Sequence, residues 1–123
     1  MLVLGATDTI GGVASVASQV TCTIFGMELN AGTETYKVLY QGQLAAAAAT
    51  IYTAPASTQS FVKSIHIVNN DTVARTFQLF RGGTAAANDI TPAVTLSASG
   101  WAVYDENGWK IYNSSGTIQT GNF

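Results

Sequence analysis

Residues 61–80 read FVKSIHIVNNDTVARTFQLF and carry the clearest structural signal in the chain. Two runs of β-branched and aromatic residues flank Asn69-Asn70-Asp71-Thr72, whose side chains bond their own backbone and tolerate left-handed conformations. The pattern predicts a β-hairpin with strands at 61–68 and 73–80. Alternation along these strands predicts that six residues point inward: Phe61, Ile65, Ile67, Val73, Phe77 and Leu79.

Shorter strand signals precede this segment. Val20, Cys22 and Ile24 alternate with threonines, which predicts a half-buried strand over 20–25. Turn residues at 30–32 separate it from a second strand at 35–40. The alanines at 45–49 predict a connector, with a short helix as the alternative, because so short a run does not overcome the cost of helix nucleation. A strand at 50–53 then ends before Pro55, which cannot donate to a ladder.

A second hairpin is predicted near the C-terminus. The aromatic segments 101–104 and 109–112 flank Asn107-Gly108, and Asn-Gly favours a type I′ turn with positive φ at both positions. A further short strand is expected at 90–96, interrupted by Pro92. Many short strands separated by turn residues predict an all-β fold, an antiparallel β-sandwich or jelly-roll-like domain. We expect this domain to span residues 44–123, with residues 1–43 as an N-terminal β arm or strand-exchange segment.

Composition excludes several classes of function. Charged residues make up 10% of the 123 residues, and the net charge of −2 cannot supply the positive field that nucleic-acid binding needs. No apolar run reaches the roughly 20 residues of a membrane-spanning helix, so we expect neither a nucleic-acid nor a membrane partner. With one cysteine, Cys22, and one histidine, His66, a structural metal site is not expected, and no cofactor is predicted. Low charge suits an exterior covered by other subunits.

The side chains of a catalytic site are difficult to assemble from this sequence. Ser64 and His66 share a face of the predicted strand, yet no acid partner follows from their spacing. Cys22 reads as a small buried hydrophobe. Asp105 and Glu106 are adjacent and are expected to belong to the turn before Gly108. We therefore predict that the protein is not an enzyme.

Contact with other proteins is the remaining expectation. Four aromatic residues within twelve positions could fill the core or form an exposed contact patch, and stacking on a host glycan is an alternative for the same side chains. Alternation in the 20–25 strand suggests a second contact region. The candidate interface residues are Val20, Ile24, Phe25, Trp101, Tyr104, Trp109 and Tyr112.

Residues 51–112 resemble small virion proteins of tailed bacteriophages. The resemblance is carried by Tyr-Thr-x-Pro-Ala at 52–56, Val-Lys-x-Ile at 62–65 and the asparagines at 69–70. The segment 100–104, with the turn at 107–109, is similar to the C-terminal part of those proteins. The resemblance implies a β-sandwich module that decorates a capsid or builds a tail or baseplate, commonly as a trimer.

Two functions follow as expectations. The first is a capsid cement or decoration protein, located in the virion, that stabilises the major capsid protein lattice as a homotrimer by binding only the assembled state. The second is a tail, baseplate or receptor-binding module whose C-terminal aromatics stack on glycans.

Overall fold

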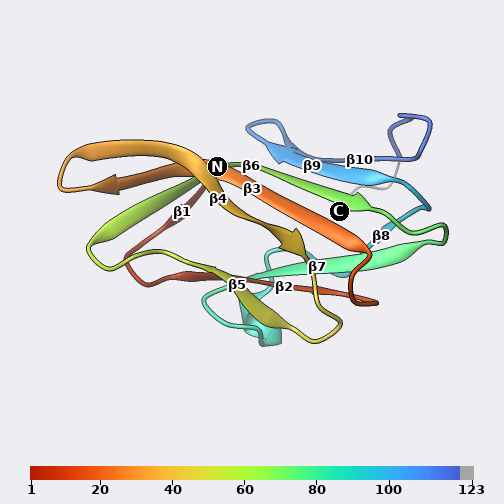
Figure 1. The fold of residues 1–123 in the computed structure, drawn as a ribbon, viewed down its shortest axis with the longest axis horizontal. Helices are drawn as coiled ribbons and strands as arrows, with labels where there is room; N and C mark the ends of the chain where they lie inside the picture. The colour runs from red at the N-terminus through yellow and green to blue at the C-terminus, as the bar shows by residue number, and fades with distance from the viewer. Residues whose placement is uncertain (120–123) are drawn as a thin grey trace.

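The computed structural model describes residues 1–119, and these form two antiparallel β-sheets packed face to face (Figure 1). Strand order in the six-stranded sheet is β10-β9-β6-β3-β4, with β1 paired to the free part of the β6 edge. Its strands are β1 (Leu2–Leu4), β3 (Val20–Asn30), β4 (Thr33–Gln43), β6 (Thr58–Asn69), β9 (Trp101–Asp105) and β10 (Gly108–Tyr112). The antiparallel sandwich is therefore confirmed, while a jelly-roll connectivity stays a prediction.

The smaller sheet has the strand order β5-β2-β7-β8. Its strands are β2 (Thr9–Ala14), β5 (Ala49–Thr53), β7 (Arg75–Arg81) and β8 (Val94–Leu96). A single 3₁₀ turn, η1 (Ala86–Asn88), interrupts the loop before β8. The alanines at 45–48 form no helix, as expected, and β5 ends two residues before Pro55. β8 is shorter than the strand expected at 90–96, because it begins only after Pro92.

The hairpin predicted at 61–80 is wrong. β6 and β7 lie in different sheets, and the chain crosses between the layers at residues 70–74 (Figure 1). Strands β3 and β9 occupy both edges of β6 at residues 65–68, and β2 and β8 occupy both edges of β7. No edge of either strand is left for the other, so the turn-forming residues at 69–72 serve a sheet-to-sheet connection instead.

Four of the six predicted inward residues are confirmed. Ile65, Ile67, Phe77 and Leu79 are buried in the core between the sheets. Phe61 instead points outward, because the pairing of β6 with β3 shifts at Phe25/Gly26 and reverses the alternation beyond that point. Val73 is exposed because it lies in the crossing loop before β7 begins.

One core spans the boundary expected at residue 43. Leu4, Ile10 and Ile24 come from the range 1–43 and pack in the same cluster as Ile67 and Leu79. β3 also pairs with β6 along eleven residue positions in the centre of the sheet. Residues 1–43 are thus part of the sandwich in this chain, and strand exchange between copies stays a prediction. The last four residues of the expected 44–123 domain lie outside the described range.

The C-terminal hairpin is confirmed, with its turn shifted by one residue. Asp105 pairs with Gly108, so Glu106-Asn107 form the two-residue loop. Gly108 has φ of 90°, but Asn107 is not left-handed, so the type I′ turn expected at Asn107-Gly108 is wrong. At the β3–β4 turn, Ala31 and Gly32 both have positive φ, which is the conformation that tight hairpins favour.

Candidate interaction surface

The outer face of the six-stranded sheet is the surface that collects exposed apolar side chains. Cross-strand pairing arranges them in rows. One row runs from Val3 through Phe61 and Met27 to Tyr36. Another runs from Val68 through Trp101 to Tyr112. We call this surface the outer apolar stripe, and its exposed or half-buried members are Val3, Phe25, Tyr36, Val38, Phe61, Val68, Trp101, Val103 and Tyr112, while Met27 in the same row is buried.

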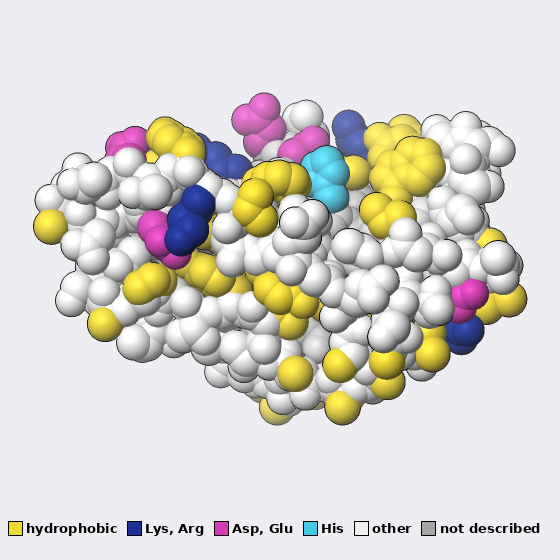
Figure 2. Space-filling model, viewed as in Figure 1, with side chains coloured by type: hydrophobic (Ala, Val, Ile, Leu, Met, Phe, Trp, Pro, Cys, Tyr) yellow, Lys and Arg dark blue, Asp and Glu magenta, His cyan; other side chains and the backbone are white. Residues whose placement is uncertain are grey.

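The middle of the outer apolar stripe is formed by Phe25 and His66. Their ring centroids are 5.3 Å apart, with the rings at 76°, an edge-to-face arrangement that aromatic pairs favour. Val38 pairs with Phe25 from β4, and Val103 pairs with His66 from β9. Figure 2 shows hydrophobic side chains on both sides of the single histidine along this face. His66 thus contacts an aromatic ring, and no acid partner completes a triad with it among residues 1–119.

The sequence-predicted interface residues divide between the two faces of the sheet. Val20 and Ile24 are fully buried in the core, so the prediction that they contact a partner does not fit this fold. Phe25 follows them in the chain and points outward, with 38% of its surface exposed. The alternation that suggested a contact strand therefore marks the core face of β3, and only Phe25 belongs to the outer apolar stripe.

The four C-terminal aromatics divide in the same way. Trp109 and Tyr104 pack against the core with ring centroids 5.3 Å apart, and Trp109 also lies 5.9 Å from the Phe77 ring of the opposite sheet. Trp101 and Tyr112 stack on the outer face, 5.3 Å apart and within 18° of parallel. The core interpretation is thus confirmed for Tyr104 and Trp109, while contact of Trp101 and Tyr112 with a partner stays a prediction.

Four exposed residues of the outer apolar stripe are not among the interface residues predicted from the sequence: Val3, Tyr36, Val38 and Val68. Tyr36 is the most exposed of them, at 67%. For Val3 and Val68 the alternation itself is a signal, since each lies next to buried residues on its own strand, whereas Tyr36 and Val38 lie in a stretch of β4 that is exposed throughout. To identify these four residues, one must know which strands pair with each other, and the periodicity of the sequence does not provide this.

Few charges border the outer apolar stripe. The Lys63 ammonium lies 5.8 Å from the centre of the Tyr36 ring, a distance suited to a cation–π contact. Lys63 also lines a shallow hollow with Met1, Asp105 and Glu106, between the start of β1 and the β9–β10 turn. Basic and acidic groups therefore both lie beside the apolar rows.

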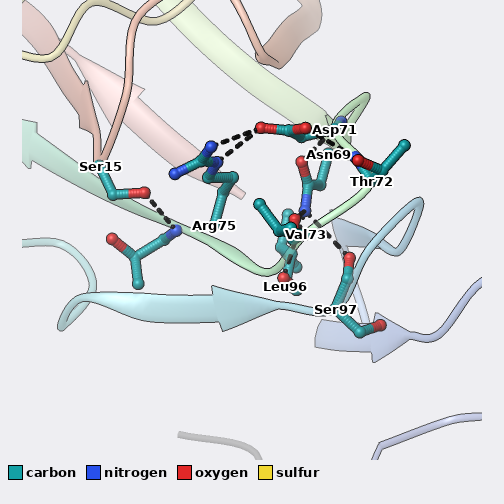
Figure 3. Close-up of polar contacts among 9 residues, drawn as sticks. Ser15, Asn69, Asp71, Thr72, Val73, Arg75, Leu96 and Ser97 are labelled. Carbon is teal, nitrogen blue, oxygen red and sulfur yellow. Dashed lines mark hydrogen bonds and ion pairs between the residues drawn. The ribbon is translucent and has the colours of Figure 1, made fainter.

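Two buried polar clusters join the sheets at their ends. In the first, the Asn69 amide donates to the backbone oxygens of Val73, Leu96 and Ser97 at 2.9, 3.3 and 3.0 Å, as Figure 3 shows. Its Oδ1 accepts the Asp71 N–H at 3.0 Å. The Asp71 carboxylate in turn binds Arg75 at 2.7 Å, and hydrogen bonds from Arg75 and Thr72 hold the pKa of Asp71 below its usual value.

The second cluster is centred on Tyr52 of β5. Its hydroxyl lies 2.7 Å from Glu28 Oε2 and 2.7 Å from Ser60 Oγ, both on the opposite sheet. Glu28 is also paired with Lys37 at 3.2 Å. Burial raises the pKa of Tyr52 to about 12, with Glu28 acting in the same direction and the Ser60 hydrogen bond opposing it.

Chemical groups for catalysis are not brought together in the described range. Burial raises the pKa of the Cys22 thiol to about 12, so the sulfur is a protonated core group, as the sequence predicted. No group of three His, Cys, Asp or Glu side chains is placed to hold a metal ion within residues 1–119. Over the same residues, no helix has the length and apolar character needed to cross a bilayer.

Among residues 1–119, the side chains of the outer apolar stripe lie outside the core cluster. The stripe covers one face of the larger sheet, whereas both polar clusters and the C-terminal Trp109 serve to hold the two sheets together. Comparison with known proteins found no matching family model, curated protein or solved structure.

Proposed function

We propose that the protein is a structural component of a bacteriophage virion that binds the assembled capsid lattice through the outer apolar stripe. The observation that carries the proposal is the placement of four aromatic side chains on one outward sheet face: Trp101, Tyr112, Phe25 and Tyr36. Contiguous exposed apolar surface is typical of protein interaction sites. Aromatic side chains dominate the binding energy of such sites.

Binding of this kind would stabilise a capsid by mass action. A protein that contacts neighbouring lattice subunits adds its binding free energy to the assembled state and none to the separated subunits. The low charge of the chain reduces the desolvation cost of covering its surface. Repetition over the lattice makes weak individual contacts effective. The resemblance that suggests the virion also implies a trimer, which stays a prediction.

The test is occupancy on purified virus particles. Wild-type protein should be present in hundreds of copies per particle by quantitative mass spectrometry, as expected of a shell protein. A handful of copies would place it in the tail or baseplate, and absence from particles would overturn the proposal.

Variants locate the contact on the sheet. Trp101→Ala should reduce occupancy about tenfold or more, because tryptophan is enriched among the hot-spot residues that contribute about 2 kcal/mol or more to an interface. Thr117→Ala, at an exposed position outside the stripe, is the control that should keep full occupancy. Both variants should unfold at the wild-type urea concentration within error, since Trp101 is outside the core cluster.

A glycan-binding function is the second candidate, and one observation favours it. Trp101 and Tyr112 present nearly parallel, partly exposed rings, which is the arrangement that stacks on a sugar ring. A glycan array separates the two functions. Binding that disappears in Trp101→Ala while the variant stays folded would favour the glycan module, and an array without binding would exclude it.

A further inference from the structure

The first half of β4 is an open strand edge. Among residues 1–119, β4 pairs only with β3, and all six residues of Thr33–Val38 are exposed. The β3–β4 turn lies at the far end of the long axis of the molecule (Figure 1). Backbone donors and acceptors on such an edge are available to another strand.

The segment Thr33–Val38 lacks most of the features that normally protect an edge strand, and the bulge of β4 lies just beyond it, at Leu39. Neither of the two prolines of the chain lies in it. Its one cation, Lys37, is held by Glu28 on the core-side face of the sheet. The strand is also eleven residues long, whereas protected edges are commonly short. This edge is therefore suited to pairing.

We propose that β4 pairs antiparallel with β4 of a second copy, centred on Thr35. An antiparallel pair of identical strands has a two-fold axis perpendicular to the sheet, so the pair must be centred on a residue. Centring on Glu34 or Lys37 would place like charges directly opposite each other, which is destabilising. Centring on Tyr36 would place the Glu34 carboxylate against Val38.

The Thr35 register gives complementary partners across the pair. Glu34 would lie opposite Tyr36 of the second copy, and the Tyr36 hydroxyl already donates to Glu34 at 3.2 Å within one chain. The Lys63 ammonium sits beside that same ring. Among the described residues, neither Glu34 nor Lys63 forms an ion pair within the chain. Each copy would therefore bring a carboxylate that lacks an ion-pair partner to an ammonium of the other copy that also lacks one.

Pairing in this way extends the apolar surface. The two-fold axis keeps the outer faces of both six-stranded sheets on the same side, so the two outer apolar stripes join through Tyr36 and Val38. This inference does not depend on the proposed virion function, because it concerns the free protein. It predicts an even number of subunits, in contrast to the trimer that the sequence resemblance implies.

Sedimentation equilibrium and site-specific cross-linking of the full chain test the pairing. The wild-type chain should have the mass of two 12.8 kDa chains. Thr35→Lys places two ammonium groups at the axis and should raise the dissociation constant about tenfold or more, while the neutral Thr35→Gln control stays paired. Glu34→Lys should weaken pairing, and adding Lys63→Glu should restore it.

Cross-linking fixes the register. Thr35→Cys should form a disulfide-linked dimer under mild oxidation, because residues directly opposite in a strand pair have Cβ atoms about 5 Å apart. Thr33→Cys, whose copies would lie four positions apart, should not. Cys22 is buried and cannot compete. A wild-type monomer or trimer, or equal cross-linking of both cysteine variants, would overturn the proposal, whatever the occupancy on virus particles.

Discussion

The two ends of the sandwich are joined by buried polar groups of different chemistry. At one end, the Asn69 amide binds three backbone oxygens and one N–H and connects β6 with the β8 segment. At the other, the Tyr52 hydroxyl of β5 binds Glu28 and Ser60 of the six-stranded sheet. The Asn69 amide does not titrate, whereas the Tyr52 phenol does. The comparison indicates that pH should affect the two ends differently.

The Asn69 cluster also explains how the chain changes sheets. A strand that leaves its ladder exposes backbone oxygens, and burying these without partners is costly. The Asn69 side chain binds the oxygens of Val73, Leu96 and Ser97, which come from both segments that pass this end. Asn69 itself has no exposed surface. The crossing between sheets is therefore held by this buried amide together with backbone hydrogen bonds from Asn70 to Gln19 and from Ser99 to Asp71.

Removing that amide should have the largest effect on stability. Asn69→Ala leaves several buried backbone groups without partners, and we expect a loss of about 3 kcal/mol or more in the free energy of unfolding. Asn69→Asp keeps the size but cannot donate, so it should lose nearly as much. Urea denaturation measures both.

The neighbouring asparagine is the matched control. Asn70 accepts a hydrogen bond from the Thr21 hydroxyl at an exposed site, so Asn70→Ala should cost less than about 1 kcal/mol. Equal losses for Asn69→Ala and Asn70→Ala would show that the crossing does not rest on the buried amide.

The Tyr52 end should respond less strongly. Tyr52→Phe removes two hydrogen bonds and leaves the buried Ser60 hydroxyl without its partner, so we expect a loss of about 2 kcal/mol in urea denaturation. Adding Ser60→Ala removes the unpaired group, and the double variant should lose less than the sum of the two single variants. Additive losses would contradict a direct Tyr52–Ser60 interaction.

The same end should lose stability at alkaline pH. The pKa of Tyr52 is raised from 10.0 in the unfolded chain to about 12 in the fold, so the folded state retains the phenol proton more tightly. Its contribution is complete below pH 10 and is lost as the pH rises toward 12. The difference in unfolding free energy between wild type and Tyr52→Phe should therefore shrink over this window. If the difference in unfolding free energy stayed constant over this window, the pKa of Tyr52 would not be raised in the folded state.

Local sequence patterns predicted the parts of the fold that depend on neighbouring residues. The alternation of Val20, Cys22 and Ile24 gave the buried face of β3, and the aromatic segments around Asn107-Gly108 gave the β9–β10 hairpin. The sequence also contains enough information to place Trp101 and Trp109 on opposite faces. Trp109 shares a face with Tyr104 in either register of a tight turn at 105–108, and Trp101 lies on the other face of the strand that carries Tyr104.

Non-local features were not accessible in the same way. The residues at 69–72 favour a reversal of the chain, but they do not specify whether the next strand joins the same sheet. The bulge in β6, where Lys63 is skipped between Val62 (opposite Gly26) and Ser64 (opposite Phe25), reverses the face of Phe61, and the alternation alone does not show where such a bulge falls. The rows of the outer apolar stripe depend on both features, so of the residues predicted for contact only Phe25, Trp101 and Tyr112 belong to the stripe.

The smallest effect should come from the ion pair that flanks Asn69. Arg75 and the Thr72 N–H hold the pKa of Asp71 below 3.8, so the folded state binds the proton more weakly than the unfolded chain. The contribution of Asp71 is therefore present above that pH and lost as the pH falls below it. Asp71→Asn should lower the urea midpoint slightly at neutral pH and leave the two proteins equal in acid. High salt should reduce the neutral-pH difference as well, because the pair lies near the surface. A difference that persists in acid would mean that Asp71 acts through its position in the loop, beside Asn69, and that its charge contributes nothing.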